Sequence, residues 1–325
     1  MKKIFFLTWG ILLAFYLVAE EPPLWYANKN VMYPETVFIS AIGSGRSAVA
    51  AKEDALTQLA LYFNAHISVN TSTDYSISQR NTVVNSHRQV SGGTVVVSES
   101  DLPAVQFSEA FYNENRHNWA VCAYISKEQA TEICKVNLQN GISEVQSLLS
   151  VAESLGIFGR FSAVAKAVDQ AESLLRDGEM LCIVNPESRN SMEQVFDLIE
   201  TSRRQFDTIK QQMTFRVDVI NDPTGTFTTI FQELLSSNGF IVSSQNARYT
   251  VVADIYASES ENPVGVFVRP GITISISENA GTGKVLSSYS KQYPKYGHIS
   301  LEGAYAKAYA EIEKDLRLHF MELFY

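Results

Sequence analysis

The stretch Val37-Phe38-Ile39-Ser40-Ala41-Ile42-Gly43-Ser44-Gly45-Arg46-Ser47-Ala48-Val49-Ala50-Ala51 decides the fold of the amino-terminal part of the chain. Its first six residues predict a strand, which Gly43-Ser44-Gly45 closes. A helix is expected from Ser47, whose hydroxyl can cap it. Small and apolar residues then recur every three or four positions, at Ala48, Ala51, Ala55, Leu59 and Phe63. This spacing predicts a helix that lies close against a sheet.

The chain beyond this helix is predicted to return to strands. Residues 66–73 alternate in polarity, which is typical of a half-buried strand. The polar segment from Asp74 to Ser100 is interpreted as a long hairpin or mobile excursion, in which residues 94–97 can form a short strand. Val105–Tyr112 and Trp119–Ile125 predict a second hairpin. Residues 24–135 are therefore expected to form one α+β domain.

Helical spacing dominates the middle of the chain, residues 136–212. Three apolar stripes predict about three helices and hence a helical connector. Their residues are Ile142, Val145, Leu148, Leu149 and Ala152; then Phe161, Val164, Ala165, Val168, Ala171 and Leu174; then Met192, Val195, Phe196, Ile199 and Phe206.

Residues 213–325 predict a second α+β domain with the approximate order β-α-β-β-β-β-α. Alternation at residues 215–219, 249–255 and 272–276 predicts strands. Gly239 is placed to end the first helix. The last helix is expected from near Ser300, with Ala304, Ala308, Ile312, Leu316 and Phe320 in steps of four. The predicted fold class is thus two small α+β domains, with antiparallel-rich sheets and packed helices, joined by a helical connector.

The first nineteen residues resemble a secretory signal peptide. Lys2 and Lys3 precede an uncharged apolar segment, and the small residue Ala19 stands before Glu20. This pattern favours export with cleavage after Ala19. An uncleaved anchor stays open as the alternative. We expect the protein in the periplasm or at the periphery of the outer membrane.

Charge and cysteine usage narrow the class of partner. The formal net charge is −9, and no basic cluster longer than a pair occurs. This argues against nucleic acid and against an anionic membrane surface as the main partner. Membrane association through partners or a retained signal stays open. Cys122, Cys134 and Cys182 fit no zinc spacing, and their disulfide state is left open.

The amino-terminal domain resembles the lipoprotein-20 family of bacterial envelope proteins. The similar stretches are Pro23-Leu24-Trp25 with Tyr33-Pro34, Ile39–Gly45, Ser47–Ala51 with Asp54-Ala55-Leu56, and Trp119–Ile125. They cover about one third of the chain. The resemblance implies an envelope protein without known catalytic activity, and it carries over no catalytic residue.

This sequence departs from the family pattern at the lipid anchor. A bacterial lipoprotein has an acylated cysteine at the cleavage site, whereas Glu20 stands there in this chain. The membrane anchor of the family is therefore in doubt here. The carboxy-terminal domain faintly resembles the accessory domain of envelope lipoproteins that activate peptidoglycan synthases or assemble secretion channels.

The motifs that resemble cofactor sites are weak. Residues 43–48 fit G-x-G-x-x-A between a strand and a helix, but an acidic residue at the expected spacing of a dinucleotide fold is missing. We interpret this segment as a tight strand-to-helix turn. Gly281-Thr282-Gly283-Lys284 lacks the first glycine of a phosphate loop and is also interpreted as a turn. The five histidines show no zinc-protease spacing, so we predict no catalytic, cofactor-binding or metal-binding residue.

One polar segment is the candidate interaction loop. Arg80, His87 and Arg88 make residues 74–100 locally basic on an otherwise acidic chain. Loops of this length inside a compact domain are usually functional or disordered, and plain disorder or a solvated hairpin is the alternative.

The function expected from these features is non-enzymatic binding or a structural role in the cell envelope. The partners would be envelope proteins or the cell wall, with no cofactor. The related alternatives are an accessory activator of peptidoglycan synthesis and an envelope or flagellar assembly factor. The alternative from another class is an enzyme, either a glycan-acting hydrolase or a cofactor-binding enzyme.

Overall fold

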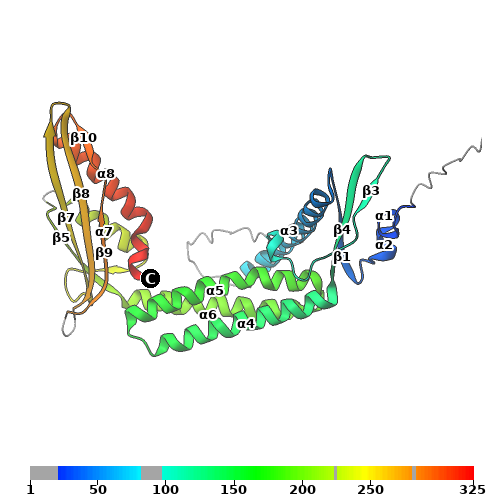
Figure 1. Cartoon of the computed structure of the whole chain (residues 1–325). Helices are drawn as coiled ribbons and strands as arrows, with labels where there is room; N and C mark the ends of the chain where they lie inside the picture. Colours follow the sequence, from blue (N-terminus) through cyan, green and yellow to red (C-terminus); the bar gives the residue numbers. More distant parts are fainter. Residues whose placement is uncertain (1–20, 82–96, 223–224, 280–282) are drawn as a thin grey trace, which may run out of the picture. The chain divides into compact units, whose positions relative to one another are not determined.

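The computed structural model describes residues 21–81, 97–222, 225–279 and 283–325. It divides into two compact units (Figure 1). The first comprises Met1–Ile133 with Ile183–Asn185, and the second comprises Cys134–Cys182 with Pro186–Tyr325. Each unit combines helices with a mainly antiparallel sheet, which confirms the predicted α+β class.

The sheet of the first unit is built around one central strand. β1 (Phe38–Gly45) runs antiparallel to β4 (Asn118–Ser126), with Ile42 opposite Cys122. β2 (Gln106–Phe107) and β3 (Phe111–Asn113) pair with β4 as well. The second predicted hairpin is present, with its first arm divided into these two short strands.

α3 (Ala48–Asn81) covers one face of this sheet. The amide of Ala50 donates to the Ser47 hydroxyl at 3.2 Å, so Ser47 caps this helix as predicted. Every fourth residue from Ala51 is buried: Ala51, Ala55, Leu59, Phe63 and Ile67. This stripe accounts for the small residues near the helix start, which let its backbone approach the sheet.

Two predictions for the segment after this helix were wrong. Residues 66–73 are helical and do not form a strand. Polar and apolar residues do alternate there, but the buried stripe of the helix continues through the segment, since Ile67 is the next buried position after Phe63. Residues 74–81, assigned to the hairpin, also belong to α3. Residues 82–96 lie outside the described part of the chain.

Two short helices, α1 (Leu24–Ala27) and α2 (Lys29–Met32), pack on the other face of the first sheet. Trp25 and Tyr33 are buried there against Cys122 and Tyr124. The rings of Tyr33 and Tyr124 stack with centroids 4.3 Å apart. The sheet of the first unit is therefore covered on both faces.

The middle of the chain contains three long helices, as predicted: α4 (Lys127–Glu153), α5 (Ile157–Val184) and α6 (Asn190–Gln212). Val145, Val164 and Val195, one from each predicted stripe, are fully buried. Phe161 and Ile209 belong to the same hydrophobic cluster as the carboxy-terminal sheet. The carboxy-terminal ends of α4 and α6 and the amino-terminal end of α5 thus share the core of the second unit.

The sheet of the second unit has the strand order β10-β8-β7-β5-β6, and β9 pairs with β8 beside β10. The strands are β5 (Thr214–Ile220), β6 (Ile241–Val242), β7 (Tyr249–Asn262), β8 (Gly265–Glu278), β9 (Val285–Gln292) and β10 (Tyr296–His298). β5 is parallel to β6 and β7, and the other pairs are antiparallel. The predicted order lacked one short strand after the first helix of this unit.

Two helices pack on one face of the second sheet, α7 (Thr226–Ser237) and α8 (Leu301–His319) (Figure 1). They bury apolar side chains of alternate strand positions, including Val251 and Ile274. Gly239 follows α7 with φ +83°, so the predicted helix stop is present. The 3-10 turn η3 (Phe320–Phe324) continues α8 and adds Phe320 and Phe324 to the core.

Ser300 caps α8 by accepting a hydrogen bond from the amide of Gly303 at 3.2 Å. We expect Ser300→Ala to lower the free energy of unfolding by about 1 kcal/mol, because a helix-terminal amide loses its acceptor. Urea unfolding of both proteins measures the change. Ser300→Thr keeps the hydroxyl and should stay close to wild type; an equal loss in the two variants would contradict the capping role.

Candidate functional site

The glycine motif of residues 43–48 is explained by packing. A Cβ added to Gly43 would lie 2.0 Å from the Ala55 nitrogen and 2.3 Å from the Ala51 carbonyl oxygen. A Cβ at Gly45 would lie 2.6 Å from the Ala51 nitrogen. The Ser44 amide, between the two glycines, donates to Asp54 Oδ2 at 2.8 Å. The backbone of α3 therefore occupies the space that the glycines leave open.

The other sequence candidates are not brought together among the described residues. Arg80 lies on α3, whereas His87 and Arg88 fall outside the described residues. Their shared role in an interaction loop stays a prediction. Gly281 and Thr282 also fall outside, and Gly283, with φ +65°, leads into β9.

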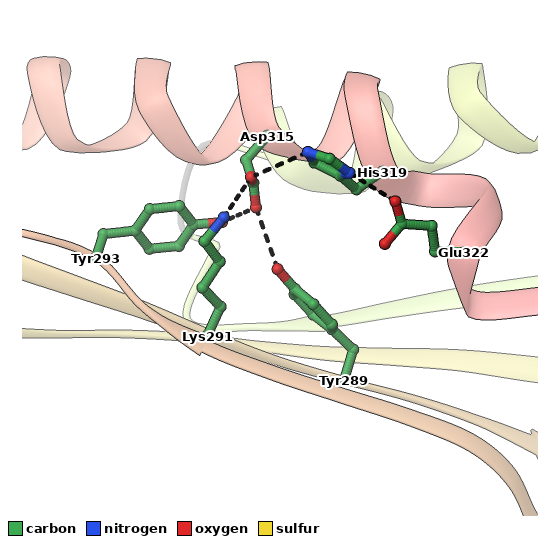
Figure 2. A network of polar contacts seen from close by, with 6 residues as sticks. All are labelled: Tyr289, Lys291, Tyr293, Asp315, His319 and Glu322. Atoms are coloured by element: carbon green, nitrogen blue, oxygen red, sulfur yellow. Dashed lines mark hydrogen bonds and ion pairs between the residues drawn. The ribbon is translucent and has the colours of Figure 1, made fainter.

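A polar network that the sequence analysis missed joins α8 to the strand region 289–293 (Figure 2). Asp315 accepts from Lys291 Nζ at 2.5 Å, from the Tyr293 hydroxyl at 2.7 Å and from the Tyr289 hydroxyl at 3.2 Å. Tyr289, Lys291 and Tyr293 alternate in sequence, so their side chains leave the same side of the chain and reach one carboxylate. The Asp315 side chain is only 13% exposed.

His319 extends this network toward solvent. Its Nδ1 lies 2.7 Å from Glu322 Oε1, and its Nε2 lies 3.9 Å from Asp315 Oδ1. Asp315 and His319 are one helical turn apart on α8, and Glu322 follows in η3. The arrangement places an imidazole between two carboxylates.

A small cavity of about 150 Å³ lies beside the network. Ser287 and Tyr289 of β9 contribute polar groups to it, and Asp315, His319 and Glu322 line the opposite side. Ile274, Phe320 and Leu323 are among its apolar lining residues. A cavity of this size has room for a few non-hydrogen atoms.

The protonation states of the network are those of a stable ion pair. Burial pushes the pKa of Asp315 upward, but hydrogen bonds from Lys291, Tyr293 and Tyr289 together hold it below its usual value. The hydrogen bond to Asp315 raises the pKa of Lys291. Burial, followed by the Asp315 charge and hydrogen bond, raises the pKa of Tyr289 and of Tyr293.

All of these shifts move the pKa values away from neutral pH. A general base or an amine nucleophile needs a pKa close to the working pH. Here the lysine and the tyrosines are held in their protonated forms and the aspartate in its ionised form. We therefore interpret the network as a clamp that holds α8 on the sheet.

Removing one hydroxyl tests this interpretation. Tyr293→Phe deletes the 2.7 Å hydrogen bond to Asp315 while keeping the ring, so we expect a loss of about 1–2 kcal/mol in unfolding free energy. Chemical denaturation monitored by circular dichroism measures it. An unchanged midpoint would show that the hydroxyl does not stabilise the fold.

The other candidate chemical groups in the described part of the chain are the cysteines and clusters of acidic residues. No group of three or more His, Cys, Asp or Glu residues among the described residues can hold a metal ion. Cys122, Cys134 and Cys182 are buried. Burial raises the pKa of the Cys122 and Cys134 thiols to about 11, which makes both poor nucleophiles at neutral pH.

None of the helices in the described part of the chain combines the length and the apolar character needed to cross a bilayer.

Sequence signals for the network exist but are indirect. Tyr289, Lys291 and Tyr293 repeat with the period of a strand, and Asp315 lies next to Leu316 on the buried stripe of the last helix. A carboxylate beside an apolar stripe indicates a buried partner. Its partners lie more than twenty residues away, so only the tertiary structure identifies them.

Comparison with known proteins shows similarity at the level of solved structures. No protein-family model matches the sequence, and no curated protein matches it. The secreted protein HP1454 from Helicobacter pylori is 12% identical with a TM-score of 0.40, covering 87% of this chain and 97% of that chain.

Two lipoprotein structures match smaller parts. A minor lipoprotein from Acinetobacter baumannii is 12% identical over 34% of this chain and 90% of its own, with a TM-score of 0.26. Lipoprotein GNA1162 from Neisseria meningitidis is 11% identical over 31% of this chain and 96% of its own, with a TM-score of 0.23. These values assign no function to the present chain.

Proposed function

We propose that this chain is an exported, non-enzymatic protein of the bacterial cell envelope that binds other envelope components through protein contacts. The amino-terminal signal-like segment supports export, and the resemblance of residues 24–135 to the lipoprotein-20 family supports the envelope. The Asp315 network supports a non-enzymatic role, because its groups are held in unreactive protonation states. The compartment is the periplasm or the periphery of the outer membrane.

The observation that carries a binding role is the edge strand β9. It pairs with β8, and within the described residues the sheet ends there. The amide of Tyr293 donates to the Pro270 carbonyl at 3.0 Å, so the amides of the odd-numbered residues of this segment point toward β8. Because inter-strand hydrogen bonds alternate in an antiparallel pair, the amides of Ser288 and Ser290 point away from β8.

An open edge of this kind accepts an extended segment of a partner as an additional strand. The outward amides of β9 would donate to the carbonyl groups of that segment. By contrast, the edge of β1 is partly occupied, since Lys29 donates to the Ser40 carbonyl and Asp54 accepts from the Ser44 amide. We therefore assign the protein contact to β9.

A pair of substitutions at one position tests this function. Ser290→Pro removes an outward amide without removing a ladder bond, and proline is tolerated on edge strands. Ser290→Ala removes only the hydroxyl. In envelope extracts crosslinked in intact cells, we expect complexes with wild type and with Ser290→Ala, and their loss with Ser290→Pro. Complexes unchanged by Ser290→Pro would exclude strand addition at β9, and no complexes at all would contradict the binding function.

A further inference from the structure

The face of the second sheet opposite α7 and α8 carries an ordered set of hydroxyl groups. Cross-strand neighbours share a face, so the pairings Asp254 with Thr273 and Thr273 with Ser290 define one row. The next row contains Val252, Ser275 and Ser288. Thr273, Ser288 and Ser290 are exposed, and the Thr273 and Ser290 hydroxyl oxygens lie 3.3 Å apart. This outer face is therefore polar and accessible.

Two aromatic rings lie flat on the same face. Tyr256 is opposite Gly271, and a Cβ on Gly271 would lie 2.4 Å from the Tyr256 ring. Phe267 is opposite Gly297, where a Cβ would lie 2.7 Å from the Phe267 ring. Each glycine thus lets a ring rest on the backbone of the neighbouring strand. Tyr256 is 40% exposed, so the ring keeps a free surface.

The rings and hydroxyls are spread along the length of β8 and the strands that pair with it. Gly271, which lies beneath the Tyr256 ring, and Phe267, whose ring lies over Gly297 of β10, are four residues apart on β8, or about 14 Å along the strand. Thr273 and Ser275 extend this series beyond the Tyr256 ring. The spacing suits a linear polymer that contacts the sheet over several repeating units.

Charges on this face cancel. Arg216 pairs with Asp218 at 2.9 Å, and Arg269 donates to the Tyr293 carbonyl at 3.4 Å. Asp254 accepts from Asn221 at 2.9 Å. Two arginines and two aspartates sum to zero. An anionic polymer would gain no net attraction here, and the few apolar groups between the rings do not form the apolar centre of a protein interface.

We propose that this outer face binds an uncharged glycan chain, and we assign the glycan strand of the cell wall as its source. The apolar faces of sugar rings stack on Tyr256 and Phe267, because aromatic rings offer large flat apolar surfaces. The hydroxyls of Thr273, Ser288 and Ser290 exchange hydrogen bonds with sugar hydroxyl and amide groups. The neutral face matches the neutral sugar backbone. The proposal rests on export to the envelope, and it adds a ligand separate from the protein contact at β9.

Co-sedimentation of the full-length purified protein with purified cell-wall sacculi tests the proposal. We expect saturable binding that soluble N-acetylglucosamine oligosaccharides compete away. Tyr256→Ala should weaken it by about tenfold or more, since a stacking surface worth roughly 1.4 kcal/mol is lost. Tyr112→Ala is the matched control, because Tyr112 is 41% exposed on the first unit and should leave binding unchanged.

A second variant keeps the test valid if Tyr256→Ala fails to fold. Thr273→Val with Ser290→Ala preserves shape and removes two hydroxyls, and it should weaken binding at least several-fold. The glycan site would be overturned if wild type did not sediment with sacculi. It would also be overturned if folded Tyr256→Ala and the double variant both bound sacculi as tightly as wild type. Crosslinking with Ser290→Pro is independent of sacculi, so failure of the glycan site and failure of the protein contact are separate results.

Discussion

Replacing Gly43 with alanine is expected to lower the free energy of unfolding of the first unit by at least about 3 kcal/mol. The added Cβ would meet the backbone of α3 at Ala55 and Ala51, 2.0 and 2.3 Å away. Backbone atoms inside a helix cannot move aside as a side chain can, so α3 must separate from β1. Hydrogen exchange of peptides from residues 38–67 measures the loss, because it reports on this unit alone.

Gly156→Ala is the control for the Gly43 variant. A Cβ at Gly156 meets no atom within 4 Å, so the substitution should change stability little. If Gly43→Ala left hydrogen exchange unchanged, the close approach of α3 to β1 would be wrong. The glycine would then require another explanation, such as a ligand-binding turn.

The second large effect is expected for Asp315→Asn. The substitution removes the charge that Lys291 neutralises and weakens the hydrogen bonds from Tyr289 and Tyr293. Hydrogen bonds to charged groups contribute more than neutral ones, so we expect a loss of about 2–3 kcal/mol at neutral pH. Urea unfolding gives the value. Glu313→Gln, on the same helix but in an exposed pair with Arg317, should cost about 0.5 kcal/mol or less.

The pH dependence follows from the directions of the two pKa shifts. The lowered pKa of Asp315 means that its stabilisation is complete above the unfolded value of about 3.9 and is lost as pH falls through the folded pKa. The raised pKa of Lys291 means that its contribution is complete below about 10.4 and is lost as pH rises through the folded pKa.

The difference in stability between wild type and Asp315→Asn should therefore be present at neutral pH and shrink toward zero in acid. Urea titrations at several pH values measure it. A difference that grew in acid would contradict an ionised Asp315 in the folded protein.

The sequence predicted helices correctly where apolar residues repeat at helical spacing over many residues. The steps of four from Ala51 to Phe63 predicted α3, and the apolar stripes around Val145, Val164 and Val195 predicted the three long helices. It failed at residues 66–73, where β-branched residues produce an alternation inside a helical stripe. The segment is helical because Ile67 is buried one turn after Phe63 and continues the helical stripe. A few residues of sequence do not show which side chains are buried, so they could not distinguish helical from strand spacing.

The candidate sites depended even more on tertiary structure. Lys291 and Asp315 are 24 positions apart and meet only because α8 folds back over the sheet. The outer face with Tyr256, Thr273 and Ser290 likewise requires the register of three strands. The glycines at 43 and 45 were visible in sequence, but their partner, the backbone of α3, was not.

The mass of the mature protein in fractionated cells tests the central claim, an exported envelope protein, most directly. Intact-mass measurement of the chain purified from each fraction reports both the compartment and the amino terminus. The account predicts a species beginning at Glu20 in the periplasmic or outer-membrane fraction. A full-length chain confined to the cytoplasm would contradict it.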